Sequence, residues 1–256
     1  MKTSIVNKKY EDVMAMKKPK HLKPWKQHIF FRWLLKVLSF FDLHATNFTY
    51  NRIGMDKLGK DEPCLVLMNH SSFIDLEIIS TVMYPRPFNI VATSDSFMGI
   101  MNVVMRLIGC IPTRKFVMDP SLIKDMIYTI KKLKSSVVMY PEASYSFDGT
   151  ATPLPDSLGR CVKMLGVPVV MVRTYGAFTR DPLYNGLRRR KVDVSADMKY
   201  LLSTKEVAEK SADEIATIIN QEFAFDNFRW QQENKVLVKE PFRAEGLNRV
   251  LYKCPH

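Results

Sequence analysis

LVLMNHSSFIDLEII, residues 65–79, is the stretch that decides the fold, because a short apolar run ends there at a polar turn. The four apolar residues 65–68 are typical of a buried strand. The Asn and Ser residues that follow indicate a turn, and a helix is expected to begin at Ser72 or Asp75 and to run through Ile79. In such a strand-to-helix corner, His70 lies at the edge of a sheet and the carboxylate of Asp75 can reach its Nδ1 atom.

This pair of side chains is suited to general-base chemistry. An imidazole that a carboxylate holds in one tautomer can remove the proton of an attacking hydroxyl group, since its pKa lies near neutral pH. His70 is therefore a candidate base, and Asp75 is the residue that orients it. The spacing alone is not specific, because Asp75 could equally begin a helix and His70 could be an ordinary turn residue. Residues further along the chain are needed to decide between the catalytic and the purely structural role of this pair.

Four blocks of sequence resemble, in order, those of a known enzyme family. NHSSFID, residues 69–75, resembles the Asn-His-x4-Asp signature of the glycerolipid acyltransferases, the family of 1-acyl-glycerol-3-phosphate acyltransferase. IPTR (111–114), YPEASYS (140–146) and GVPVV (166–170) resemble its other blocks. The resemblance covers residues 65–172, and four ordered blocks are far more specific than one. It implies transfer of an acyl group from a thioester to the hydroxyl group of a lysolipid.

The resemblance also implies roles for individual residues. Arg114 is expected to bind the acceptor's phosphate, because a guanidinium group can form two parallel hydrogen bonds with it, and Lys115 adds a second cation. Glu142 is expected to bind a hydroxyl group of the acceptor or to hold Arg114 in place. Ser144 and Tyr145 complete the predicted substrate-binding set. Acyl-CoA or acyl carrier protein would be the co-substrate, and no metal or other cofactor is needed because a thiolate leaves readily.

The third block departs from the family's usual Phe-Pro-Glu-Gly-Thr-Arg-Ser. Ala143 replaces the glycine, Ser144 the threonine and Tyr145 the arginine, so the expected phosphate site has lost one cation. Two acceptors stay open. One is lysophosphatidic acid, held by Arg114 and Lys115. The other is a lysolipid without a phosphate monoester, whose headgroup meets Tyr145.

The composition indicates an anionic partner. Lysine and arginine number 38 against 26 acidic residues, a net charge of +12, which favours either nucleic acid or an acidic membrane leaflet. Apolar residues make up 46% of the 256 positions, enough for a sizeable core. The four cysteines are scattered and no secretory signal is evident at the N-terminus, so we expect a reducing compartment. Cys254-Pro255-His256 supplies too few ligands for a structural zinc site.

The N-terminal part looks like a membrane-binding region. Residues 1–27 form a basic arm. In HIFFRWLLKVLSFFDL, residues 28–43, His28, Arg32 and Lys36 are four apart, so that on a helix they form a narrow basic stripe within a broad apolar face. This segment is too short and too charged to span a bilayer. It suits a helix that lies in the membrane interface on the cytoplasmic side, which argues for membrane and against nucleic acid as partner. The alternative is a helix docked on the protein's own core.

The rest of the chain predicts an α/β fold with a central, mostly parallel sheet flanked by helices. We divide the chain into residues 1–62, the arm and interface helix, with a polar break over residues 47–61, and residues 63–256, the acyltransferase domain. Strands are predicted at 65–68, 88–92, 137–140 and 167–172, with an edge strand at 191–200. Helices are predicted at 75–83, 96–107, 120–134, 158–165 and 204–225.

These observations favour an acyltransferase of phospholipid biosynthesis that moves a fatty acyl group to a lysophospholipid, most simply 1-acyl-glycerol-3-phosphate. The rival hypothesis is a non-catalytic lipid-binding protein of the same fold, which the changes at Ala143 and Tyr145 would suit. The intact pair of His70 and Asp75 argues against that rival.

Overall fold

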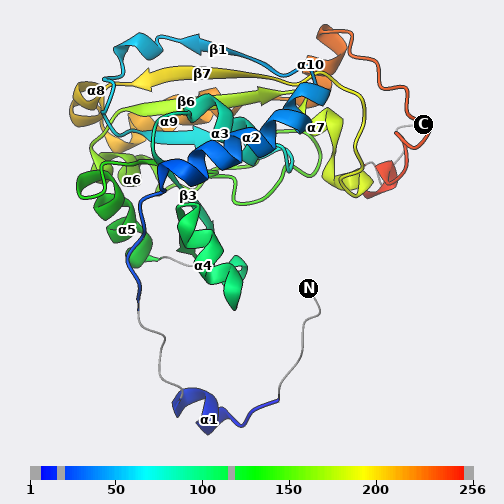
Figure 1. The fold of residues 1–256 in the computed structure, drawn as a ribbon. Helices are drawn as coiled ribbons and strands as arrows, with labels where there is room; N and C mark the ends of the chain where they lie inside the picture. Colours follow the sequence, from blue (N-terminus) through cyan, green and yellow to red (C-terminus); the bar gives the residue numbers. More distant parts are fainter. Residues whose placement is uncertain (1–6, 16–20, 115–118, 251–256) are drawn as a thin grey trace.

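A seven-stranded sheet forms the centre of the computed structural model, which describes residues 7–15, 21–114 and 119–250 (Figure 1). The strand order is β1-β7-β6-β2-β5-β3-β4, and every neighbouring pair is parallel except β6 with β7. The strands are β1 (Thr49–Ile53), β2 (Leu65–Met68), β3 (Phe88–Thr93), β4 (Cys110–Thr113), β5 (Ser136–Met139), β6 (Val169–Tyr175) and β7 (Ser195–Leu202). The predicted fold class, α/β with a mostly parallel sheet, is confirmed.

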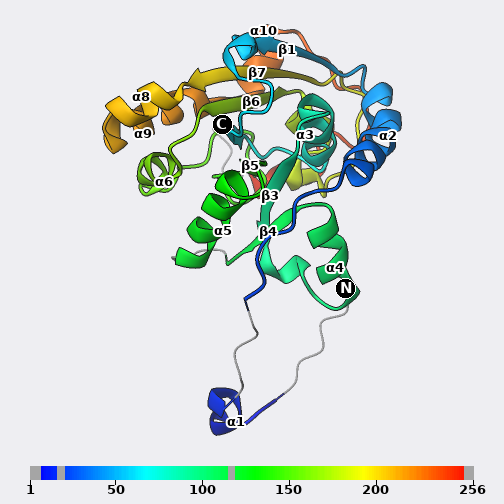
Figure 2. The same ribbon diagram turned by 60° about the vertical axis from the view of Figure 1, so that its left-hand side comes forward.

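Helices cover both faces of this sheet. In Figure 2, α5 (Pro120–Lys131), α6 (Leu158–Leu165) and α9 (Ala212–Phe223) lie on one side, and α2 (Ile29–Ala45) and α3 (Asp75–Met83) lie on the other. The shorter helices are α1 (Tyr10–Ala15), α4 (Ile100–Leu107), α7 (Ala177–Arg180), α8 (Thr204–Glu209) and α10 (Asn227–Glu233).

The strand β2 lies in the middle of the core. All four of its residues are fully buried, and they alternate between the two faces. Val66 and Met68 belong to the apolar cluster under α3, whereas Leu65 and Leu67 belong to the cluster under α5, α6 and α9. A strand buried on both faces has no polar side chain along its length, which is why a continuous apolar run identified it.

Several predicted elements are placed correctly. The strand at 65–68 and the helices at 75–83 and 158–165 have the predicted bounds, and a helix covers residues 29–45. The helix expected from residue 96 begins only at Ile100, after Gly99, whose φ of 55° is not helical. Within the described residues no helix has the length and apolar character needed to cross a membrane.

Three expectations for the strands and helices are wrong. The polar segment 47–61 contains β1, which pairs with β7 although its five side chains are exposed. The sheet therefore begins before Pro63, and β7 is an interior strand between β1 and β6, not an edge strand. The helix expected over 204–225 is two helices, because Ser203 and Ser211 each start a capping box, with Glu206 and Glu214 respectively.

The helix α2 is docked on the protein's own core, which is one of the two alternatives that the sequence left open; its binding to a membrane stays a prediction. It packs on α3 with Ser39 and Leu43 buried, yet it exposes a row of aromatic side chains, among them Phe41 at 72%. Two cations of its basic stripe contact the turn after α3: Arg32 donates to the carbonyl of Pro85, and the Lys36 ammonium lies 4.2 Å from the centre of the Tyr84 ring. These cations fasten α2 to the protein while its aromatic face stays uncovered.

Candidate active site

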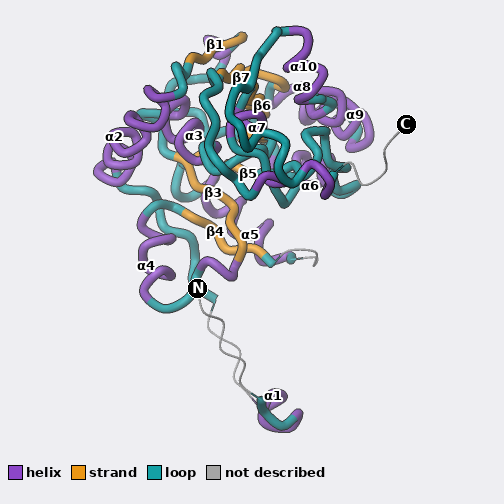
Figure 3. The backbone as a smooth tube through the Cα atoms, turned by 90° about the vertical axis from the view of Figure 1, so that its right-hand side faces the viewer, coloured by secondary structure: helices purple, strands orange, loops and turns teal. Residues whose placement is uncertain are grey.

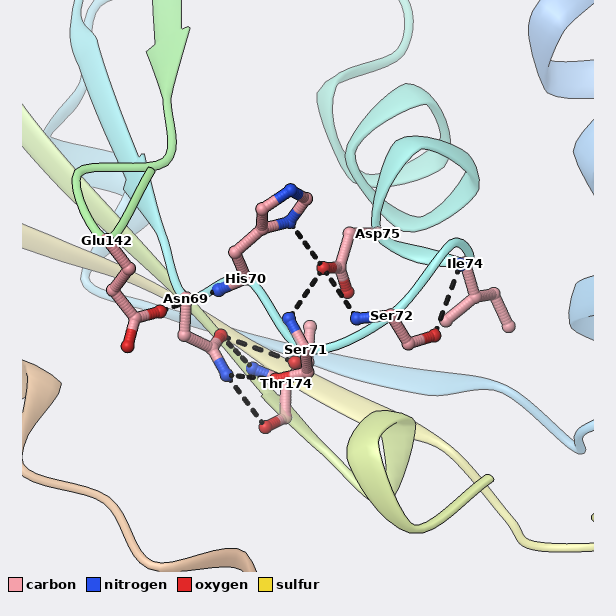
Figure 4. Close-up of polar contacts among 8 residues, drawn as sticks. All are labelled: Asn69, His70, Ser71, Ser72, Ile74, Asp75, Glu142 and Thr174. Carbon is pink, nitrogen blue, oxygen red and sulfur yellow. Dashed lines mark hydrogen bonds and ion pairs between the residues drawn. The ribbon is translucent and has the colours of Figure 1, made fainter. Parts of the chain in front are cut away.

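His70 and Asp75 meet at the corner between β2 and α3, as the sequence predicts. The Nδ1 atom of His70 lies 2.9 Å from Oδ2 of Asp75 (Figure 4). The same oxygen accepts hydrogen bonds from the backbone N–H groups of Ser71 at 2.8 Å and Ser72 at 3.0 Å. Asp75 is 1% exposed and is the first residue of α3. It therefore holds the turn and the imidazole with one carboxylate oxygen.

This contact fixes the chemistry of the imidazole. When Nδ1 donates its proton to the carboxylate, Nε2 of the neutral ring carries the free lone pair. The His70 side chain is 21% exposed, so the ring remains accessible from the surface. The geometry is that of a general base with an orienting carboxylate.

Two tyrosine rings enclose this imidazole. The centres of the Tyr140 and Tyr145 rings each lie 4.2 Å from the centre of the His70 ring. Phe73 packs edge-on against Tyr145 at 5.3 Å. Burial raises the pKa of Tyr145 to about 12 and that of Tyr140 well above its usual value, so both phenols are neutral at physiological pH. Tyr145, which stands where the family has arginine, thus lies against the His70 imidazole.

Glu142 holds the backbone of His70. One carboxylate oxygen accepts the His70 N–H at 2.8 Å and the other accepts the Thr152 N–H at 3.0 Å. Glu142 is 7% exposed; burial raises the pKa of its carboxyl group, and the two amide hydrogen bonds counter that effect. The expected contact with Arg114 is not formed: Arg114 lies at the end of β4 and pairs with Asp119 instead. The N–H of Ser146 donates to the His70 carbonyl at 2.8 Å, so the third block holds His70 at both of its backbone groups.

Asn69 links the end of β2 to the end of β6. Its Oδ1 atom accepts the N–H of Thr174, in β6, at 2.8 Å, and its Nδ2 donates to the Ser71 hydroxyl at 3.1 Å (Figure 4). At 7% exposure the side chain is buried. Asn69 therefore holds the shape of the turn. The backbone N–H groups of Ser71 and Ser72 in this turn already donate to Asp75.

The other predicted substrate-binding residues lie further from the base. Arg114 is at the end of β4, its side chain is 62% exposed, and its Nε lies 3.4 Å from Asp119 Oδ2. Since β5 and β3 separate β2 from β4, the two strand ends are about 14 Å apart at ordinary strand spacing. Ser144 is exposed. Lys115 and the C-terminal Cys254-Pro255-His256 lie outside the described residues.

The sequence did not single out Arg180 and Asp181, which lie beside the turn. Arg180 is 3% exposed and binds Asp181 at 3.1 Å and also Asp42 of α2. Burial raises the pKa of Asp181 to about 6, while the Ser72 hydroxyl and Arg180 lower it. Their position follows from β6, which ends at the same edge of the sheet as β2. No three His, Cys, Asp or Glu residues in the described part of the chain are grouped to hold a metal ion.

Comparison with known proteins places this site in a family. A family model described as Acyltransferase matches residues 27–174, more than half of the chain, including all four blocks and the His70–Asp75 pair. The chain belongs to the acyltransferase family. Its fold resembles the crystal structure of the 1-acyl-sn-glycerophosphate (LPA) acyltransferase PlsC from Thermotoga maritima, with a TM-score of 0.60 and 15% identity over 82% of this chain and 81% of that one. The resemblance to glycerolipid acyltransferases is confirmed.

The alanine at position 143, where the family's third block has glycine, adopts a strained backbone conformation. Ala143, in place of glycine, has a φ of 60°, a left-handed conformation that costs an L-residue about 1–2 kcal/mol. We expect Ala143→Gly to raise the free energy of unfolding by about 1 kcal/mol, measured by urea denaturation.

The neighbouring position provides the control. Ser144 is exposed as well but does not have a positive φ, so Ser144→Gly relieves no strain and is expected to lower the stability by about 0.5 kcal/mol. Equal effects of the two glycine substitutions would contradict the assignment of strain to residue 143.

Proposed function

We propose that this acyltransferase moves a fatty acyl group from acyl-CoA or acyl carrier protein to the free hydroxyl group of a lysophospholipid, with lysophosphatidic acid as the preferred acceptor. The observation that carries the proposal is the 2.9 Å contact between His70 and Asp75 within the four blocks. The similar PlsC protein is itself an LPA acyltransferase, which supports the same choice of acceptor here. The alternative acceptor, a lysolipid without a phosphate monoester, is favoured by the tyrosine at position 145.

The geometry supports a direct transfer in one addition and one elimination. Nε2 of His70 takes the proton of the acceptor hydroxyl group while its oxygen attacks the thioester carbonyl carbon. Asp75 stabilises the imidazolium that forms, because its carboxylate faces Nδ1. When the tetrahedral intermediate collapses, the carbon–sulfur bond breaks and the imidazolium returns the proton to the departing thiolate. The products are the ester and the free thiol, and His70 is neutral again.

The role of His70 is tested by substitution. We expect His70→Ala to lower kcat by about 10²- to 10⁴-fold, the range for loss of a general base. Transfer of radiolabelled acyl groups to lysophosphatidic acid measures this. His44→Ala, which removes an exposed imidazole on α2, is the control and should retain activity. Full transfer by His70→Ala would overturn the proposed mechanism.

The acceptor preference depends on the cation at Arg114. A fully extended arginine and a glycerophosphate together can bridge the distance between the ends of β4 and β2, so Arg114 can contact the phosphate while the hydroxyl group reaches His70. A charge-assisted hydrogen bond contributes about 1.5–3 kcal/mol, and the exposure of Arg114 places it at the low end of this range.

We therefore expect Arg114→Gln to lower kcat/KM about tenfold for lysophosphatidic acid and to leave it nearly unchanged for lysophosphatidylcholine. Arg229→Gln is a matched control, because Arg229 is also exposed and also pairs with one carboxylate, that of Glu233. A preference of the unsubstituted enzyme for lysophosphatidylglycerol or lysophosphatidylcholine over lysophosphatidic acid would favour the alternative acceptor.

We further propose that the protein works at the cytoplasmic face of a membrane and that α2 binds the interface. The support is the exposed aromatic face of α2, together with the net charge of +12. Deleting α2 is not a clean test, since Leu43 is part of the core. A point substitution on the exposed face avoids this problem.

We expect Phe41→Glu to reduce co-sedimentation with phosphatidylglycerol vesicles by about tenfold, because a carboxylate replaces an apolar side chain in the interface. Leu237→Glu is the matched control, since Leu237 and Phe41 are both 72% exposed. Equal losses for the two variants would show a general effect of the added negative charge and would remove the support for α2.

A further inference from the structure

The helix α4 exposes an apolar surface that neither the core nor the proposed chemistry uses. Its first residue, Ile100, is 81% exposed, and Met98, Met101, Val103 and Val104 are between 39% and 55% exposed. Its single charged residue, Arg106, is 7% exposed and turned inward, where it donates to Asn102 and to the carbonyl of Leu22. The outer face of α4 is therefore apolar and uncharged.

A short segment of the arm connects this face to that of α2. Residues 22–26 lead directly towards α2, and Leu22 and Trp25 within them are 48% and 44% exposed. The carbonyl of Leu22 accepts from Arg106 of α4, and the carbonyl of Trp25 accepts from Asn89 of β3 at 2.7 Å. Figures 2 and 3 both show α2 and α4 on the same flank of the sheet. We call the exposed apolar surface of α4, residues 22–26 and α2 the apolar flank.

We propose that α4 and residues 22–26 bind the membrane together with α2, so that the whole apolar flank lies on one leaflet of an anionic bilayer. This inference rests on the membrane location proposed for α2 and adds a second contact, formed by α4.

The chemistry of the flank matches a lipid leaflet. The sequence from Phe97 to Leu107 contains no acidic residue. The segment 22–26 adds two exposed cations, Lys26 and Lys23, whose ammonium group lies over the Tyr128 ring of α5, and cations near the surface favour anionic headgroups. Trp25 and Trp33 are of the residue type that gathers at headgroup depth. An isoleucine that is 81% exposed projects from the surface, which suits insertion among acyl chains.

This placement would bring the bilayer to the edge of the sheet that carries the base. The segment leading into α4 starts at the end of β3, after Thr93, and β2 ends at the same edge just before His70. Phe73, which is 60% exposed beside Tyr145, adds an apolar side chain there. A lysophospholipid in the leaflet could then present its hydroxyl group to the site while its acyl chain stays in the membrane.

The first test is vesicle binding by the full chain carrying Ile100→Glu. We expect its partition onto vesicles of phosphatidylcholine and phosphatidylglycerol in equal amounts to fall about tenfold, because a carboxylate replaces an inserted apolar side chain. Met164→Glu is the control: Met164 is 54% exposed on α6, a helix that lies across the sheet from α2. Binding of Ile100→Glu equal to that of the unsubstituted protein would overturn the proposal.

The second test reports the environment of α4 directly. Ile100→Cys and Met164→Cys are labelled with the same nitrobenzoxadiazole dye, and the labelled unsubstituted protein gives the background from its own thiols. We expect vesicles to shift the emission at position 100 to shorter wavelength and to leave that at position 164 unchanged. A label at position 100 that stays in water on bound protein would show that α2 docks without α4.

A shift at position 100 that rises with protein concentration in the absence of vesicles would also overturn the proposal, because it would show that a second copy of the chain covers α4. Neither measurement requires acyl transfer. Failure of the proposed activity and failure of this docking surface are therefore distinguishable.

Discussion

Three hydrogen bonds meet at one oxygen atom, Oδ2 of Asp75, and the site depends on them. Two come from backbone amides of the turn and one from the His70 ring. A carboxylate in the first turn of a helix is stabilised by the helix dipole, so Asp75 serves the fold by starting α3 and serves the chemistry by orienting the imidazole. The N-cap role that the sequence offered as an alternative is not the one observed: Ile74 occupies the cap position of α3, and the Asp75 carboxylate accepts from Ser71 and Ser72 in the turn before the helix.

The orientation of the His70 ring also depends on the backbone that carries it. Residues 140–146, the third block, hold that backbone in place. Glu142 binds the N–H of His70 and the Ser146 amide binds its carbonyl. Tyr140 and Tyr145 then limit the rotation of the ring from two sides. The glutamate that resemblance assigned to substrate binding thus acts on the base through hydrogen bonds to the main chain. In this chain Tyr145 adds stacking where the family's usual arginine would add charge.

The fold was predictable where burial leaves a pattern in the sequence. The strand β2 is buried on both faces and has a continuous apolar run, whereas β1 has five exposed side chains and a sequence typical of a loop. The division between α8 and α9 was predictable in principle, because Ser203 and Ser211 each precede a glutamate by three residues. The His70–Asp75 contact was predictable because both residues lie in one strand-to-helix turn and because the ordered blocks further along the chain supported that interpretation of the spacing. The contacts of Tyr145, Glu142 and Asp181 were not, since they depend on strands that meet only in the folded sheet.

The position of α2 relative to the base is set by buried charge. Asp42 of α2 binds Arg180, and Arg180 binds Asp181, which lies beside Ser72 in the turn between β2 and α3. Displacing α2 would remove Asp42 and leave Arg180 with one carboxylate partner fewer. Because a buried arginine that loses a carboxylate partner destabilises the fold, the pair favours the observed position of α2. Burial raises the pKa of Asp181 to about 6, whereas the hydrogen bond with Ser72 and the charge of Arg180 lower it, so the guanidinium favours the ionised carboxylate. The chain of contacts from Asp42 through Arg180 and Asp181 to Ser72 therefore joins α2 to the turn that carries His70. If α2 binds a membrane as proposed, these buried charges connect the membrane-bound helix directly to that turn.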